Sequence, residues 1–139
     1  PVEELQEEMK KPMLGLPILG LIAAGSPIET ISGHKETLEV PAFMVGSKNS
    51  YVLQVKGDSM IEDGINSGDY VVVQEKDTPS NGEIVVALIN NSEATLKRYY
   101  KEARRIRLQP ANSSMEPIYV DADTPLKIQG VVIGLIRKY

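Results

Sequence analysis

The sequence predicts an all-β domain, built as a strongly twisted, partly closed barrel or sandwich of short strands. Two observations support this fold class. About ten short apolar runs follow one another, separated by glycine, proline, asparagine and aspartate, and almost no segment keeps a helical period. Short strands of this kind bury a shared core when sheets pack on each other or close into a barrel.

The first residues differ in character from the rest of the chain. Residues 1–15 carry four glutamates followed by two lysines, a pattern that fits a linker remnant or a short solvated helix, and Pro12 would end such a helix. We expect these residues to form a flexible tail and residues 16–139 to form one folded domain. Because the chain starts at Pro1 and not at methionine, we expect it to be a fragment or a processed product.

The strands can be placed in order. From Leu16 to Ala23 the chain is apolar apart from one glycine, which predicts a strand or an extended segment. The remaining apolar runs predict strands at Ile28–Ile31, Thr37–Val40, Tyr51–Val55, Tyr70–Gln74, Ile84–Asn90, Ala94–Tyr100, Ile106–Leu108, Ile118–Val120 and Leu126–Ile136.

The connections carry their own signals. Asn91-Ser92-Glu93 is a natural hairpin turn, and Gly130 and Gly134 predict bends or bulges within the last strand. Single helical turns are expected at Pro41–Met44, where proline suits the first position, and at Ile61–Ile65.

The charge balance argues against a nucleic-acid-binding surface. With 15 basic and 19 acidic residues, the net charge of −4 disfavours the broad phosphate attraction of a nucleic-acid-binding surface. No run approaches the roughly 18 apolar residues that span a bilayer, so we expect no membrane partner and a cytoplasmic location.

Metal and cofactor chemistry is not expected. The chain has no cysteine and a single histidine, His34, which sits among loop residues. The aspartates Asp58, Asp63 and Asp69 lack the spacing of a calcium loop and suit hydrogen bonds within turns.

One serine and one lysine stand in positions that suit catalysis. Ser59 follows the run Tyr51–Val55, where strand residues give way to turn residues, so it is held on a rigid element and faces outward. Lys97 lies in mid-strand beside apolar and tyrosine side chains, which predicts partial burial.

A serine hydroxyl needs a base, and a lysine amine can serve when desolvation lowers its pKa from about 10.4 towards neutrality. Ser59 and Lys97 are therefore a candidate dyad. An ordinary turn serine and a solvated lysine are the alternative, which local sequence alone favours.

Motifs in a specific order cover nearly all of the chain from Leu16 onward. They are Leu16–Gly25, Val55–Ile61, Ser67–Val71, Asn81–Ala87, Ala94–Arg98, Gln109–Asn112 and Gly130–Arg137. In these motifs the chain resembles the self-cleaving domain of LexA-type repressors, whose fold is shared with signal peptidase.

The resemblance implies an autoproteolytic and dimerisation domain over residues 16–139. It places the scissile bond between Ala24 and Gly25, although on its own this stretch predicts only a turn. Ser59 would be the nucleophile and Lys97 the general base. The backbone N–H groups of Asp58 and Ser59 would hold the oxyanion.

The resemblance also implies partners. Such domains form homodimers through the C-terminal strand region and cleave when stimulated by a RecA filament on single-stranded DNA. Cleavage separates them from a helix-turn-helix domain and so derepresses genes of the DNA-damage (SOS) response. That DNA-binding domain is not found in this chain, so the chain itself is expected to bind DNA weakly.

Other interpretations remain open. A UmuD-like self-processing subunit of a translesion polymerase or a phage-type repressor domain would share the dyad. Signal peptidase shares the Ser-Lys chemistry, but the missing membrane segment counts against it. A non-catalytic dimerisation or partner-binding module would keep the fold without the chemistry.

Overall fold

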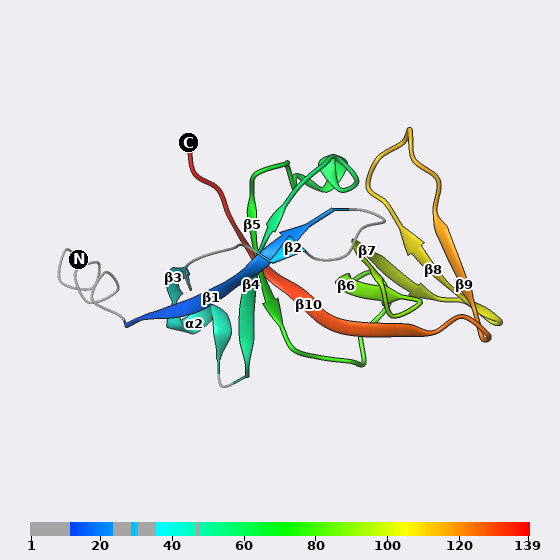
Figure 1. Cartoon of the computed structure of the whole chain (residues 1–139), viewed down its shortest axis with the longest axis horizontal. Coiled ribbons are helices and arrows are strands. Elements are labelled where there is room, and N and C mark those ends of the chain that lie inside the picture. Colours follow the sequence, from blue (N-terminus) through cyan, green and yellow to red (C-terminus); the bar gives the residue numbers. More distant parts are fainter. Residues whose placement is uncertain (1–11, 24–28, 31–35, 47) are drawn as a thin grey trace, which may run out of the picture.

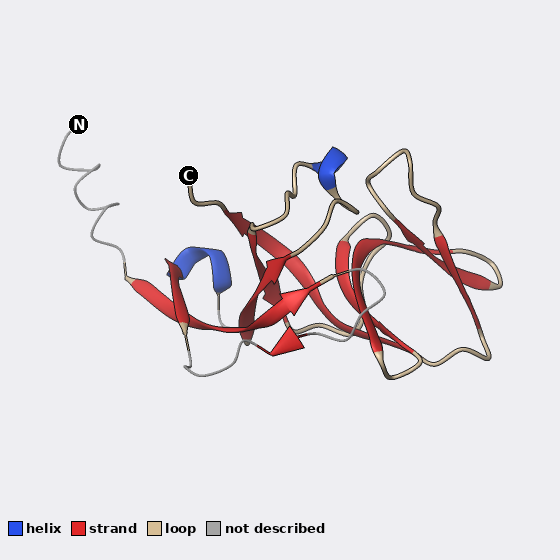
Figure 2. Ribbon diagram, turned by 45° about the horizontal axis from the view of Figure 1, so that its top comes forward, coloured by secondary structure: helices blue, strands red, loops and turns tan. Residues whose placement is uncertain are grey.

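The computed structural model describes residues 12–23, 29–30, 36–46 and 48–139. These residues are almost entirely β-structure, with two short helical pieces (Figure 2). The strands are β1 (Met13–Ile22), β2 (Glu29–Thr30), β3 (Thr37–Pro41), β4 (Ser50–Val55), β5 (Tyr70–Gln74), β6 (Ile84–Ile89), β7 (Glu93–Lys101), β8 (Arg105–Gln109), β9 (Ile118–Asp121) and β10 (Leu126–Ile136). The helical pieces are α2 (Ala42–Val45) and the 3-10 turn η1 (Ile61–Asp63).

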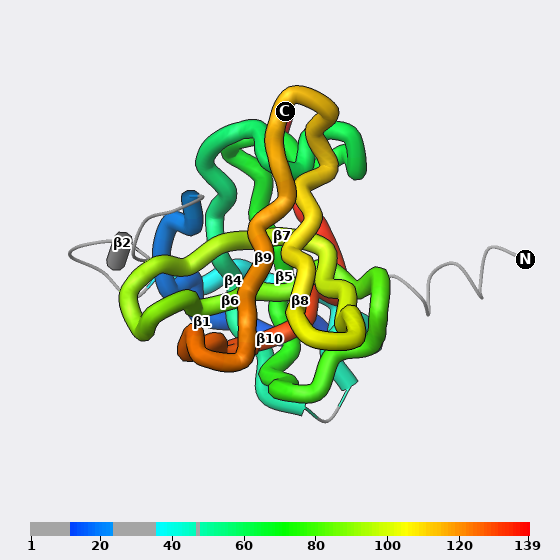
Figure 3. Tube along the Cα trace, turned by 90° about the vertical axis from the view of Figure 1, so that its right-hand side faces the viewer, coloured from blue at the N-terminus to red at the C-terminus, as the bar shows by residue number. Residues whose placement is uncertain are grey.

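The strands form one mixed sheet in the order β2-β1-β4-β5-β10-β6-β7-β8-β9, and β3 pairs with the first part of β1. Only β1 and β4 pair in parallel; the other described pairs are antiparallel. The all-β prediction is confirmed, although the sheet stays open and does not close into a barrel. Figure 3 shows the twist, with β8 and β9 crossing the direction of β6 and β7.

Strand β10 links the two halves of the sheet. It pairs with β6 along its first part and with β5 along its second, and Figure 1 shows it running across the length of the molecule. The pairing register shifts between Ile128 and Gly130 and again between Val132 and Gly134. The bulges predicted near the two glycines are therefore confirmed, and they let one strand serve both halves.

The central strands are covered on both faces. In β5, Val71 and Val73 pack with Leu53 of β4 in one cluster, whereas Val72 packs with Val52 in another. A third cluster lies under the other half of the sheet and contains Val85, Ala87, Ile89, Leu108, Val120, Ile128 and Val131. Because neighbouring residues of a strand point to opposite faces, these clusters give the sheet apolar cover above and below.

Most predicted elements are found, with small shifts at their ends. Strand β1 begins at Met13, three residues before the expected start, because Met13–Pro17 pairs with β3. The hairpin between β6 and β7 is confirmed, and Asn90 and Asn91 both take positive φ values there (54° and 58°). Asparagine tolerates this left-handed conformation better than most residues. His34 and residues 1–11 lie outside the described residues.

Gly130→Ala should destabilise the fold, because an added Cβ would lie 2.4 Å from Val73 Cγ1 and 2.8 Å from the Gln74 carbonyl oxygen. We expect a loss of about 1–3 kcal/mol in the free energy of unfolding, as for other overpacked cores. Gly15→Ala is the matched control, since its nearest neighbour would be Thr37 at an ordinary 3.7 Å. Urea unfolding measures both; equal midpoints would contradict this close approach.

Candidate active site

Ser59 lies in the loop that joins β4 to β5. The chain leaves β4 through Gly57, whose φ of 99° suits glycine, and the Gly57 N–H donates to Ser67 Oγ at 3.1 Å. Ser59 itself is half-buried, and the next residue, Met60, is almost fully buried in the central hydrophobic cluster. Met60 thus anchors the loop and holds the serine at the surface of the core.

A second loop, between β8 and β9, fixes the backbone around the serine. The Ala111 N–H donates to the Ser59 carbonyl (2.8 Å), and the Ala111 carbonyl accepts from the Glu62 N–H (2.7 Å). Asn112 Nδ2 donates to the Asp58 carbonyl at 2.9 Å. Figure 1 shows the two loops side by side at the top of the molecule. The Gln109–Asn112 motif therefore has a structural role that its sequence alone did not reveal.

The backbone N–H groups of Asp58 and Ser59 have a different environment from their carbonyls. Both carbonyl oxygens accept hydrogen bonds, that of Asp58 from Ile61 and Asn112 and that of Ser59 from Ala111. Neither N–H donates to another described residue. Among the described residues, both donors are therefore without a hydrogen-bond partner.

Lys97 is buried within β7, opposite Val85 of β6, with a 2% exposed surface. Its Nζ donates to Thr95 Oγ1 at 2.5 Å, and no carboxylate lies within ion-pair distance among the described residues. Desolvation lowers the pKa of Lys97 from 10.5 to about 8. Lys97 is thus more deeply buried than predicted, and its environment favours a neutral amine.

Thr95 is a site residue that the sequence reasoning missed. Its hydroxyl is buried and accepts the hydrogen bond of Lys97 Nζ. The alternation of side chains along a strand could have identified it. Residues i and i+2 lie on the same face, and Thr95 stands two positions before Lys97. A hydroxyl at that position orients the amine without adding a charge.

The structure ties the serine loop to the strand of Lys97 on both sides of the lysine. Leu96 shares the central hydrophobic cluster with Met60, and Arg98 Nε pairs with Asp63 Oδ2 at 2.7 Å. No hydrogen bond joins Ser59 Oγ to Lys97 Nζ. The contacts at Leu96 and Arg98 therefore bring the serine loop against β7, and Ser59 and Lys97 are not bonded to each other.

Ala24 and Gly25 lie outside the described residues. The strand that leads to them is described, and it ends next to the serine loop. Ile22 pairs in parallel with Val55, and the Lys56 N–H donates to the Ile22 carbonyl at 3.0 Å. Because the two strands are parallel, the last residues of β1 and of β4 lie at the same edge of the sheet.

Comparison with known proteins agrees with this arrangement. Residues 17–133 match the family described as Peptidase S24-like. This chain belongs to the Peptidase S24-like family. Similar proteins named LexA repressor occur in Koribacter versatilis (53% identity over 90% of this chain and 58% of the relative), Syntrophotalea carbinolica (52%, 89% and 60%) and Cereibacter sphaeroides (50%, 91% and 56%). The chain thus spans less than two thirds of the length of these relatives.

Two of the three aspartates considered as metal ligands in this Peptidase S24-like chain, Asp63 and Asp69, each pair with an arginine. Asp63 pairs with Arg98, and the buried Asp69 accepts a fork of two 2.8 Å hydrogen bonds from Arg137. The Arg137 hydrogen bonds hold the pKa of Asp69 below its ordinary value. Arg137 also donates to the Gly64 carbonyl at 2.7 Å, so the end of β10 is tied to the serine loop.

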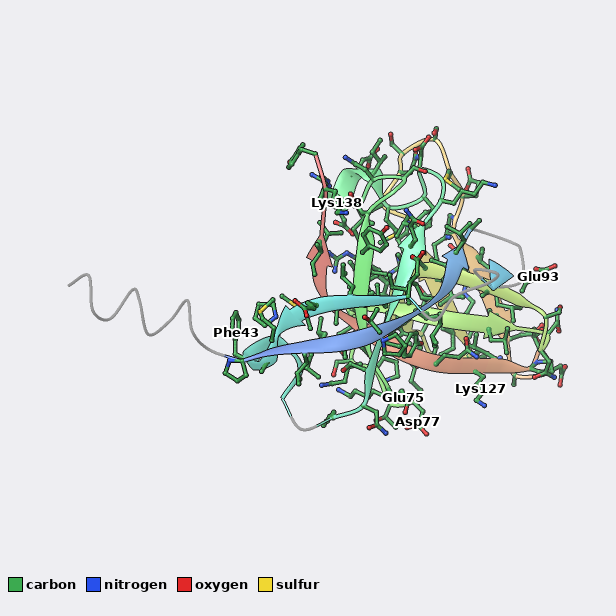
Figure 4. The ribbon with its side chains drawn as sticks, turned by 60° about the vertical axis from the view of Figure 1, so that its left-hand side comes forward. Phe43, Glu75, Asp77, Glu93, Lys127 and Lys138 are labelled. Atoms are coloured by element: carbon green, nitrogen blue, oxygen red, sulfur yellow. The ribbon has the colours of Figure 1, made fainter. Side chains whose placement is uncertain are left out.

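A separate hollow of about 590 Å³ lies away from these residues. It is lined by Leu19, Tyr51, Leu53, Glu75, Lys76, Asp77, Lys127, Ile128 and Gln129. Figure 4 shows Glu75, Asp77 and Lys127 on that side of the molecule, so its rim carries both signs of charge.

The described helical pieces include none long and apolar enough to cross a membrane.

Lys97→Met should stabilise the protein at neutral pH. Below pH 8 the lysine is charged in both states, and its lowered pKa corresponds to a burial cost on the order of 3 kcal/mol. Between pH 8 and 10.5 the unfolded state binds more protons than the folded state, so the wild type gains stability and the advantage of the variant should shrink.

Urea unfolding in a Ser59→Ala background, from pH 6.5 to 10.5, measures this difference without interference from self-cleavage. Lys127→Met is the control, because Lys127 is an exposed lysine of β10 and its removal should change little. A Lys97→Met variant less stable than its parent at pH 7 would show that the buried cation is well stabilised.

Proposed function

We propose that this chain is the self-cleaving serine protease and dimerisation domain of a LexA-type transcriptional repressor of the SOS response. The observation that carries the proposal is the buried Lys97, with its pKa near 8 and a single hydroxyl partner. At pH 7 about one such lysine in ten is neutral, against about one in 3,000 at the ordinary pKa. A neutral amine can serve as the base that a serine nucleophile requires.

The proposed reaction takes place within the chain. Ser59 Oγ attacks the carbonyl carbon of Ala24 while neutral Lys97 takes the hydroxyl proton. The N–H groups of Asp58 and Ser59 hold the oxyanion. The bond from Ala24 to Gly25 then breaks, the protonated lysine gives its proton to the Gly25 nitrogen, and water releases the acyl group from the serine.

The pairing of β1 with β4 supports this assignment of the bond. Ala24 is two residues beyond Ile22, and Ser59 is four residues beyond the paired Val55. An extended residue spans at most about 3.6 Å, so both segments need to travel only a short way to meet. A bond held on the same chain has a high effective concentration at the nucleophile, and modest catalytic groups can suffice.

The partners follow from the same family proposal. The chain would form a homodimer, act in the cytoplasm, and reach DNA through a helix-turn-helix domain of the full-length protein. A RecA filament on single-stranded DNA would stimulate cleavage by favouring the docked cleavage segment. The relatives named LexA repressor favour this interpretation over a UmuD-like subunit of a translesion polymerase or a phage-type repressor. A helix-turn-helix in the full open reading frame would separate repressor from polymerase subunit.

Ser59→Ala should abolish self-cleavage and leave the fold intact, because the hydroxyl is the proposed attacking group. Purified chain is incubated at pH 9 and its fragments are weighed by mass spectrometry. The wild type should split between Ala24 and Gly25, and the variant should stay whole with an unchanged urea midpoint. A wild-type chain that never splits would favour a non-catalytic partner-binding module.

Cleavage by the wild type should speed up with pH as Lys97 loses its proton. Since the lowered pKa is about 8, the first-order rate should rise about tenfold from pH 6 to 7, more slowly near pH 8, and level off above pH 9. Lys97→Arg should be inactive throughout, because a guanidinium does not release its proton in proteins. A flat wild-type profile, or an active arginine variant, would contradict the role of Lys97.

A further inference from the structure

Arg98 forms an ion pair that bridges two separate elements of the site. Its Nε donates to Asp63 Oδ2 at 2.7 Å, and its guanidinium also donates to the Gly82 carbonyl. Arg98 lies in β7 directly after Lys97, and Asp63 lies in η1, which begins two residues after Ser59. The pair therefore connects the strand of the proposed base with the loop of the proposed nucleophile.

The guanidinium of Arg98 is also oriented by a contact other than the one with Asp63. The Gly82 N–H donates to the Tyr99 carbonyl at 2.7 Å, so Gly82 is itself bound to β7. Arg98 is then oriented by the Gly82 carbonyl next to its own strand. Asp63 accepts a single hydrogen bond from Nε of this oriented guanidinium, so the planar arginine bonds two acceptors, one on each side of the connection.

No other hydrogen bond joins β7 to the serine loop among the residues that the structure describes. Outside its own residues and the adjoining strand β4, the loop bonds to Ile22 of β1, to Ala111, Asn112 and Ser113 of the β8–β9 connection, and to Arg137 just after β10. These bonds fix the loop itself. Among the described residues, the Arg98–Asp63 pair is the one hydrogen bond that, together with the apolar packing of Met60 and Leu96, sets the distance from the loop to Lys97.

We propose that Arg98 and Asp63 are a positioning pair that sets the strand of Lys97 against the loop of Ser59. This inference rests on the proposed function and adds two residues that touch neither substrate nor reacting atoms. Both side chains are partly exposed, at 36% and 23%. Surface ion pairs of this kind contribute little to global stability, so their removal should affect geometry more than folding.

The Asp69–Arg137 pair differs from the Asp63–Arg98 pair in the burial of its carboxylate. Asp69 is only 3% exposed, so its two hydrogen bonds with Arg137 contribute to stability, and breaking them would leave a buried charge unpaired. The two ion pairs attach to the same loop, but their effects should separate. Loss of the buried pair should lower stability, and loss of the Asp63 pair should lower the cleavage rate.

The test compares self-cleavage rates of the full chain from pH 6 to 10. Asp63→Asn keeps the shape of the side chain and removes its charge, and Asp63→Glu restores a carboxylate. We expect Asp63→Asn to lower the plateau rate about tenfold without moving the midpoint of the pH profile, as expected for misplaced catalytic groups. Asp63→Glu should recover most of the rate, and Arg98→Lys, which has no fork, should fall between.

Glu102→Gln provides the matched control. Glu102 accepts hydrogen bonds from Arg105 and Arg107 in a comparable exposed network just beyond the end of β7, and its loss should leave the rate unchanged. Urea midpoints of all variants, taken in a Ser59→Ala background, should match the parent and so exclude unfolding as the cause of a slower rate.

Three results would overturn the inference. One is wild-type plateau cleavage by Asp63→Asn. Another is a shifted midpoint with an unchanged plateau, which would mean that the pair acts on the charge of Lys97. The third is an equal loss in Glu102→Gln. A wild-type chain that stays whole at every pH would instead refute the proposed function and, with it, any role for the pair in cleavage.

Discussion

The burial of Lys97 is the constraint on which the rest of the site depends. A cation with one hydroxyl partner and a 2% exposed surface is costly, and a domain of this size has a net stability of only about 5–15 kcal/mol. The rest of the fold must offset that cost. It does so with a sheet whose central strands are buried on both faces and with a buried carboxylate, Asp69, that is fully paired with Arg137.

The parallel pairing of β1 and β4 is the second constraint. Parallel neighbours need a long connection, and here it contains β2, β3 and α2 between Ile22 and Ser50. A tight hairpin would have turned the chain back and sent the two strand ends to opposite edges. The long connection instead places the ends of β1 and β4 together, as the proposed reaction between two parts of one chain requires.

Local sequence signals predicted the strands, the bulges near Gly130 and Gly134 and the hairpin between β6 and β7, because each depends on residues close in the chain. The turn was predicted at Asn91-Ser92-Glu93 and lies one residue earlier, because Asn90 takes a positive φ and Glu93 already pairs in β7. The burial of Lys97 followed from its apolar neighbours in the same strand. What the sequence did not reveal depends on distant residues. Asp63 and Arg98 are 35 positions apart, and Ala111 and Ser59 meet through backbone atoms that carry no side-chain signature. Whether the sheet closes is also a matter of accumulated twist, which no single strand encodes.

Under the proposed function, the pKa of Lys97 limits how cleavage can be controlled. If about one lysine in ten is already neutral at pH 7, complete deprotonation can raise the rate only about tenfold. A larger stimulation must therefore act on another quantity, namely the fraction of molecules in which the cleavage segment is docked or the geometry of the docked state. Because the serine loop meets β7 through the Asp63–Arg98 pair and the packing of Met60 with Leu96, their relative placement is a quantity that a partner could change without touching the proposed base. A stimulating protein thus needs no catalytic group of its own, only a higher affinity for the docked arrangement.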